Sequence, residues 1–137
     1  MKARQIQTRY WDDGFISTAQ WQSRYVYLYI LTCSAINLTG IFQLSDRKIS
    51  FETGLSNEDV EIGLQELAVH KKVLSYRGWV YVPNSFKNNR YWKSSKVVEA
   101  WEIEFSQINS EALSFFEQEM NTTIYRDQRT EIERYHS

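Results

Sequence analysis

The sequence predicts a mainly α-helical fold with a small β-wing, and three observations lead to that prediction. The 137 residues are 42% hydrophobic and 15% aromatic, which suits one compact domain with a small addition. Two helical stretches, 46–53 and 57–72, are separated by a tight turn. Two β-prone stretches, 73–76 and 79–82, follow directly. Helix, turn, helix and hairpin in this order predict a winged helix-turn-helix with an N-terminal extension and C-terminal helices.

The segment before this motif is expected to hold a short extension and one buried helix. "YWDDGFIS" favours an irregular turn or a one-turn helix anchored by Trp11 and Phe15. Ser17 or Thr18 is expected to cap the helix "AQWQSRYVYLYILTC", whose apolar residues lie on most of its sides, as in a buried helix. "NLTG" ends that helix, and "IFQL" is predicted to form a short strand.

Local signals also mark the ends of the motif's own elements. Ser45 is expected to cap the helix 46–53 and Gly54 to end it. Ser56 is expected to cap the helix 57–72, which would turn its stripe of Val60, Leu64 and Leu67 inward. Arg77-Gly78 fits a two-residue hairpin turn, and the single proline follows the second strand.

The C-terminal part is expected to be helical. Ser94 or Ser95 should cap a helix, and Asn109-Ser110 should interrupt it. The organisation predicted from these patterns is a winged-helix domain with its N-terminal extension over residues 1–93, a C-terminal helical appendage over 94–119, and a polar tail of undetermined order over 120–137.

One stripe of this C-terminal helix is a candidate oligomer seam. Its apolar residues repeat with 3,4 spacing, at Val98, Trp101, Phe105 and Ile108. The alternative is that the stripe covers the winged helix of its own chain. In an oligomer, the glutamates on this helix would disfavour a parallel pairing of two copies.

Charge is nearly balanced overall but unevenly distributed. Lys and Arg number 16 and Asp and Glu 17, yet the stretch from Leu67 to Val98 contains no acidic residue. Such asymmetry indicates an anionic partner, and for this fold the partner expected is DNA. The candidate DNA-binding residues are Lys71, Lys72, Arg77, Lys87, Asn88, Asn89, Arg90, Lys93 and Lys96.

Two aromatic residues lie within this basic stretch. Tyr91 and Trp92 are candidates for stacking on unpaired bases, since an aromatic ring stacks on any base. The alternative is a solvated loop in which both rings are tucked into the core.

The helix expected to read DNA begins with acidic residues. Glu58 and Glu61 would face outward at the end that normally meets base edges, where they would repel phosphates. Acids in a first turn also stabilise the helix dipole, which explains them without reference to DNA. We therefore expect contacts from the C-terminal end of this helix, the wing and the following loop rather than from its tip.

No pattern indicates catalysis, a cofactor or a metal site. His70, His136 and the single Cys33 lack metal-ligand spacing, and no phosphate-binding glycine loop is present. We expect no enzymatic activity. The sequence has no apolar signal core, no run of membrane-spanning length and no possible disulfide within the chain, which predicts a cytoplasmic protein.

Four ordered motifs resemble the N-terminal domain of phage replisome organisers and related DnaD-like replication initiators. They are "YLYILTC", "NLTGIFQLS", "FETGLSNEDVEIGLQEL" and "WVYVPNSFKN", and the resemblance covers roughly residues 10–108. It implies a self-associating winged helix that binds phage origin DNA in a bacterial host and helps recruit the replicative helicase or its loader. Members usually carry a further C-terminal helical domain, so we expect an N-terminal fragment or a short relative. The alternatives are a winged-helix repressor and a protein-interaction module without DNA affinity.

Overall fold

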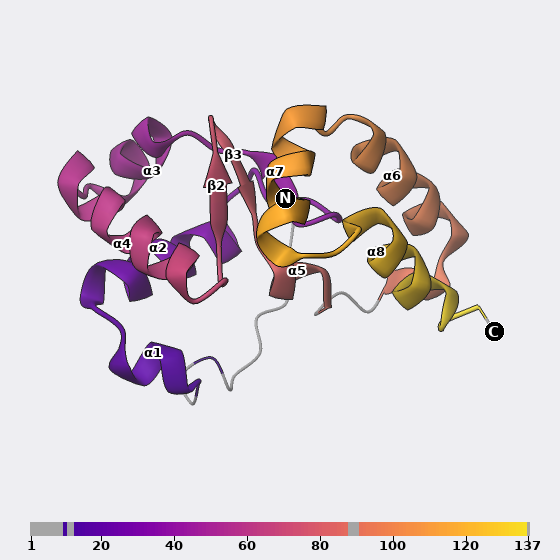
Figure 1. Ribbon diagram of the computed structural model, residues 1–137, viewed down its shortest axis with the longest axis horizontal. Helices are drawn as coiled ribbons and strands as arrows, with labels where there is room; N and C mark the ends of the chain where they lie inside the picture. The colour runs from indigo at the N-terminus through magenta and orange to yellow at the C-terminus, as the bar shows by residue number, and fades with distance from the viewer. Residues whose placement is uncertain (1–9, 11–12, 88–90, 137) are drawn as a thin grey trace.

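The computed structural model describes Tyr10, residues 13–87 and residues 91–136 (Figure 1). The elements, in chain order, are α1 (Gly14–Thr18), α2 (Trp21–Thr32), β1 (Ile41–Gln43), α3 (Asp46–Thr53), α4 (Asn57–Val69), β2 (Leu74–Tyr76), β3 (Trp79–Tyr81), α5 (Pro83–Lys87), the 3₁₀ turn η2 (Tyr91–Lys93), α6 (Ser95–Ser106), α7 (Ser110–Met120) and α8 (Ile124–Glu133). The helix–strand–helix–helix–strand–strand order from α2 to β3 confirms the predicted mainly α-helical fold with a small β-wing.

Helices α3 and α4 form the helix-turn-helix, and the sequence determines their ends locally. Ser45 Oγ accepts a hydrogen bond from Lys48 N, and Ser56 Oγ accepts one from Asp59 N. Gly54 ends α3 with a φ of 78°, a conformation that glycine adopts without steric cost. Both predicted caps and the predicted glycine stop are therefore confirmed.

Helix α4 packs closely on α2 at Gly63. A Cβ atom at this position would lie 3.0 Å from both the backbone oxygen of Gln22 and Cγ2 of Val26. The absence of a side chain therefore lets the two helices approach each other. The contact is supplemented by Gln22 Nε2, which donates to Asp59 Oδ1, and by Glu66 Oε1, which accepts from the Gln20 amide.

The three strands form an antiparallel sheet in the order β1-β3-β2. Phe42 pairs with Val80, and Ser75 pairs with Val80 from the other side. The turn between β2 and β3 is Arg77-Gly78, with φ values of 44° and 84°. Two positive φ values are what a tight type I′ hairpin turn requires, so the predicted two-residue turn is confirmed.

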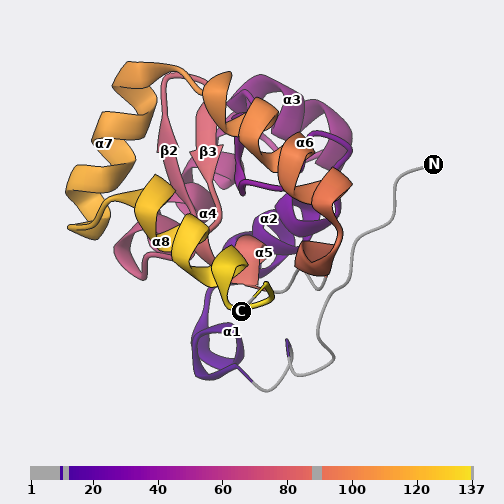
Figure 2. The same cartoon turned by 90° about the vertical axis from the view of Figure 1, so that its right-hand side faces the viewer.

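The sheet has a hydrophobic core on each face because its residues alternate in direction. Phe42 and Val80 join the core formed with α2, α3 and α4. Their neighbours Ile41 and Tyr81 join a second core formed with α6, α7 and α8. Figures 1 and 2 show the sheet between these two groups of helices. The molecule is thus a three-layer arrangement of helices, sheet and helices.

This second core changes the predicted organisation. The boundary at residues 93 and 94 does not separate two cores, because Trp92 packs on Trp101 with 6.5 Å between ring centroids. The predicted tail contains α8, which buries Ile124, Gln128 and Ile132. Residues 94–136 therefore cover the sheet rather than form an appendage and a polar tail.

Several local predictions are also corrected or confirmed. Gln20, not Ser17 or Thr18, precedes the first residue of α2, because Ser17 and Thr18 belong to α1. The one-turn helix expected near residue 14 is α1, and the strand predicted from "IFQL" is β1. Asn109 interrupts the C-terminal helix as expected, and its Oδ1 accepts from the Ala112 amide.

Candidate nucleic-acid interface

Helix α4 is the second helix of the helix-turn-helix, the helix expected from the sequence to read DNA, and its outward face is acidic at its start. Glu58, Glu61 and Gln65 are exposed, and Gln65 Nε2 donates to Glu61 Oε1 at 3.2 Å. Further along, the same helix exposes the apolar side chain of Val69 rather than a lysine or arginine. The described surface of α4 therefore offers no cation for phosphates before the helix ends at residue 69.

The two lysines predicted to extend this surface are held by carboxylates of their own chain. The helix ends earlier than expected, and Lys71 lies in the following turn with a φ of 56°. Its Nζ is 3.2 Å from Oε2 of Glu119, in α7. Lys72 Nζ is 3.2 Å from Oδ2 of Asp13. Because these partners come from distant parts of the chain, the acid-free stretch in the sequence is not acid-free in space.

The Lys72–Asp13 pair is part of the cap of α1. Asp13 Oδ1 accepts from the Phe15 amide at 2.7 Å and, more weakly, from the Ile16 amide. Burial raises the pKa of Asp13, but the hydrogen bonds from Lys72 and from these two amides outweigh it, so the pKa lies below its usual value. Lys72 also lies over the Phe15 ring, 5.7 Å from its centroid. This lysine therefore joins the end of α4 to the N-terminal extension.

The wing turn places a third predicted residue, Arg77, beside the start of α3. The Leu44 amide donates to the Gly78 carbonyl at 2.9 Å, which joins the turn to the residues just before α3. Arg77 lies over the Tyr76 ring, 5.5 Å from its centroid. Arg47 and Lys48, in the first turn of α3, are exposed and did not stand out in the sequence. We call Arg47, Lys48 and Arg77 the wing–α3 edge.

The residues of the wing–α3 edge are not held by acids. Within the described part of the chain, none of the three forms an ion pair, in contrast to Lys71 and Lys72. Asp46 is the acidic residue in the first turn of α3, and it partly offsets the positive charge. The hydrogen bond that joins the wing turn to the residues before α3 depends on strand pairing, so no pattern in the sequence indicated that Arg77 belongs with Arg47 and Lys48.

The basic aromatic stretch lies elsewhere on the molecule. Lys93 and Lys96 are exposed at and just after η2. Figure 1 places the hairpin turn at the top of the sheet and the start of α6 at the right-hand edge of the molecule. The predicted cations therefore form separate groups instead of one patch. Asn88, Asn89 and Arg90 lie outside the described residues, as do the side chains of Lys87 and Tyr91.

Trp92 is not available to stack on a base, so that prediction is wrong. Its side chain is only 1% exposed. It packs on Phe86 with 4.8 Å between ring centroids and meets the Trp101 ring edge-on. Its ring is thus one of the aromatic anchors of the second core, which is the alternative that the sequence left open.

The predicted oligomer seam is also wrong, because the chain itself covers it. Trp101 has no exposed surface, and Phe105 is buried beside it. Trp101 Nε1 donates to Gln128 Oε1 at 2.7 Å, and the Tyr125 ring stacks on the indole. Val98 and Ile108 are partly buried against the same core. The 3,4 stripe therefore packs under α8 and against the sheet.

The exposed aromatic surface lies instead on the outer face of α2. Trp21 is 50% exposed and Tyr25 is 48% exposed. Together with Leu28 and Tyr29 they line a hollow of about 590 Å³, with Arg24 at its side. Tyr29 donates to the carboxylate of Glu52, in α3, so a base and an acid flank this apolar surface.

Among the described residues, no group of three or more His, Cys, Asp or Glu side chains is arranged to hold a metal ion. None of the helices described is both long and apolar enough to cross a lipid bilayer.

Comparison of the chain with protein-family models, with curated proteins and with solved structures finds no match.

Proposed function

We propose that this chain binds duplex DNA through the wing–α3 edge, as a self-associating component of a phage-type replication initiation complex. The observation that carries the DNA-binding proposal is the hydrogen bond from Leu44 to Gly78, because it brings Arg77 to the first turn of α3 in a winged helix-turn-helix. A wing and a helix-turn-helix are both used to contact DNA backbones in this class of fold. The replication role rests on the motif resemblance alone, and with it the replicative helicase or its loader as partner.

The charges support backbone contacts more than base readout. Arg47, Lys48 and Arg77 carry no carboxylate partner among the described residues, so they are free to neutralise phosphates. Glu58 and Glu61 stand at the tip of α4, where base contacts are normally made, and they repel the DNA backbone. This combination favours binding with little sequence preference. A repressor would bind its site about 10³–10⁷-fold more tightly than other DNA.

The experiment is a salt titration of duplex binding. Each lost phosphate contact reduces the slope of log K against log salt by about 0.9, so replacing Arg47, Lys48 and Arg77 together by Gln should reduce it by about 2.7. The matched control replaces Lys93 and Lys96 by Gln. These two lysines are exposed and belong to η2 and the start of α6, away from the wing. A smaller salt slope in the control variant, with an unchanged slope in the triple variant, would place the DNA-binding surface at the start of α6. It would refute DNA binding by the wing–α3 edge.

A second pair of variants tests the acidic tip of α4. Glu58→Gln with Glu61→Gln keeps the shape of the helix and removes two negative charges. If α4 lies near the DNA, affinity at low salt should rise several-fold, because each charge repels phosphates. Unchanged affinity would indicate that the outer face of α4 points away from DNA and is available to a protein partner.

The self-association proposal rests on the aromatic face of α2, with a second copy of the chain as its occupant. In an antiparallel α2–α2 contact centred between Tyr25 and Leu28, Arg24 of each copy would face the Tyr29–Glu52 pair of the other. A two-fold contact therefore places the Arg24 guanidinium of each copy near the Glu52 carboxylate of the other. It also covers both exposed aromatic residues, Trp21 and Tyr25.

Charge reversal tests this arrangement by molar mass in solution. Arg24→Glu should weaken the assembly, and adding Glu52→Arg should restore it, because the two charges exchange places across the contact. Ile103→Ser is the control, since Ile103 is an exposed apolar residue of α6 outside the contact. A wild-type chain that stays monomeric at high concentration would contradict self-association, while the DNA titration would stand unaffected.

A further inference from the structure

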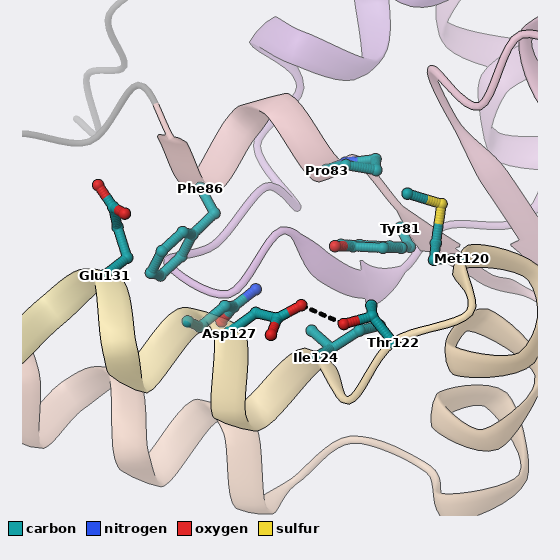
Figure 3. A pocket seen from close by; sticks show the side chains of 9 residues that line it. Tyr81, Pro83, Phe86, Met120, Thr122, Ile124, Asp127 and Glu131 are labelled. Atoms are coloured by element: carbon teal, nitrogen blue, oxygen red, sulfur yellow. Dashed lines mark hydrogen bonds between the residues drawn. The ribbon is translucent and has the colours of Figure 1, made fainter.

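A pocket of about 260 Å³ lies between the β3–α5 junction and α8 (Figure 3). Figure 1 shows α5 and α8 on the side of the molecule away from α3 and the hairpin turn. Its apolar walls include Pro83 and Phe86 from α5, Met120 from the end of α7 and Ile124 from α8. Two carboxylates of α8, on Asp127 and Glu131, also line it. The pocket thus combines an apolar wall with negative charge.

Tyr81 gives the pocket a polar group without a partner. The residue is only 7% exposed, and its hydroxyl points into the space between the Phe86 ring and Asp127 (Figure 3). Among the described residues, no hydrogen bond is made to this hydroxyl. The hydroxyl is open to the space of the pocket, so a guest bound there can use its oxygen as a hydrogen-bond acceptor.

The state of this phenol matches an electropositive guest. Burial, with a further contribution from the negative charge of Asp127, raises the pKa of Tyr81 to about 12. The phenol is therefore neutral at physiological pH, and its oxygen can accept a hydrogen bond. A bound anion would instead lie beside Asp127 and Glu131, which is electrostatically unfavourable.

The other polar groups of the pocket leave room for a donor. Asp127 accepts from the Thr122 hydroxyl, and its Oδ1 is 3.7 Å from Nε of Arg126. Glu131 Oε2 accepts from Arg134 at 2.9 Å. Arg126 and Arg134 lie outside the pocket and are well exposed, so their pairs neutralise the carboxylates only weakly. Each carboxylate keeps lone pairs for a guest, because a carboxylate accepts about four hydrogen bonds.

We propose that this pocket binds a primary ammonium group carried on an apolar stem. The ammonium would donate to the Tyr81 hydroxyl and the Asp127 carboxylate, near the face of Phe86, while the stem lies along Pro83 and Met120. Three donors on one small cation fit these acceptors, and an aromatic ring adds a cation–π contribution. Such a group can come from a lysine side chain of a partner protein or from a free aliphatic amine. The proposal does not depend on DNA binding.

The chain offers a convenient probe of this pocket. It contains two methionines, and Met120 lines the pocket. Methyl-labelled methionine therefore gives a simple spectrum in which the Met120 signal reports on the pocket and the Met1 signal serves as reference. We expect n-butylammonium to shift the Met120 signal saturably, with a Kd on the order of 1 mM for so small a ligand. Sodium chloride at equal ionic strength is the salt control.

The neutral analogue and three variants test the chemistry. n-Butanol has the same stem without the charge and should bind at least about tenfold more weakly. Tyr81→Phe and Asp127→Asn should each weaken n-butylammonium about tenfold, the value of a lost hydrogen bond to a charged group. Glu133→Gln, an exposed position of α8 outside the pocket, should leave the Kd unchanged.

Three results would overturn the proposal. One is equal binding of butanol and butylammonium, and another is no saturable shift at concentrations far above the expected Kd. The third is a lower melting temperature for Tyr81→Phe, because loss of an unpartnered hydroxyl should leave stability unchanged or raise it. If binding is confirmed, Nα-acetyl-lysine methylamide distinguishes the sources. Binding equal to that of butylammonium assigns a protein lysine, and exclusion of this bulkier ligand assigns a free amine.

Discussion

Replacing Trp101 should destabilise the fold and leave the oligomeric state unchanged. The side chain is wholly buried, and its Nε1 donates to Gln128 Oε1 at 2.7 Å. Gln128 in turn donates from Nε2 to the Thr39 carbonyl at 2.8 Å, so this one side chain joins α6 to α8 and to the residues before β1. The indole is therefore both a packing anchor and one end of a buried polar connection.

The expected magnitude follows from these two roles. Trp101→Ala should cost about 3–5 kcal/mol for the lost contacts and the remaining cavity. Domains of this size are stable by only about 5–15 kcal/mol, so that variant is close to unfolding. Trp101→Phe is the better measurement. It keeps an aromatic ring but leaves Gln128 Oε1 without its donor, and an orphaned buried acceptor costs about 1–3 kcal/mol.

Urea unfolding followed by far-ultraviolet circular dichroism measures both variants, with Ile103→Ala as the matched control. Ile103 belongs to the same helix but is 60% exposed, so its truncation should change the unfolding free energy by less than about 0.5 kcal/mol. A Trp101→Phe variant that is as stable as wild type would refute the buried connection. If the wild type is oligomeric and a Trp101 variant is a folded, stable monomer, the result would contradict the burial of Trp101 within its own chain.

Three further predictions concern the backbone and one ion pair. Gly63→Ala should cost about 1–3 kcal/mol in urea unfolding, because the new methyl group meets the Gln22 backbone, whereas Gly14→Ala, with no heavy atom within 4 Å, should be nearly neutral. Gly78→Ala should cost about 1–2 kcal/mol, since φ is 84° in the hairpin turn, and an unchanged melting temperature would argue against that turn. Asp13→Asn should lower stability at neutral pH. Because the folded-state pKa of Asp13 is depressed, its contribution is present above 3.8 and is lost as the pH falls through the lower folded value, so wild type and variant should converge in acid. A difference between them that does not depend on pH would contradict the assigned ion pair.

The caps of α3 and α4 and the hairpin turn were predictable from sequence because they depend on neighbouring residues. Ser45 and Ser56 accept from amides three residues ahead, and Arg77-Gly78 satisfies the turn through its own dihedral angles. The order of these signals was enough to predict the winged arrangement. The exposed acidic start of α4 was likewise visible, because Glu58 and Glu61 fall on the side of the helix opposite its apolar stripe.

The site predictions were less successful, because charge and aromaticity in a sequence do not reveal where a side chain points. Lys71 and Lys72 looked available in an acid-free stretch, yet their partners are 48 and 59 residues away. Trp92 looked like a loop residue because lysines surround it in sequence, and it is buried because Phe86 and Trp101 enclose it.

The sequence by itself therefore determined the elements from α2 to β3, their order and the winged arrangement, since periodicity, caps and turn residues act over a few positions. Only the tertiary structure decided what covers each surface. An apolar stripe on a helix indicates that this face is buried, but it does not identify the surface that covers it. Here Val98, Trp101 and Phe105 pack with α8 and the sheet of their own chain. The same holds for charge. Strand pairing joins the wing turn that carries Arg77 to the residues just before α3. Long-range ion pairs remove Lys71 and Lys72 from the available cations, because a residue's neighbours in space are set by packing.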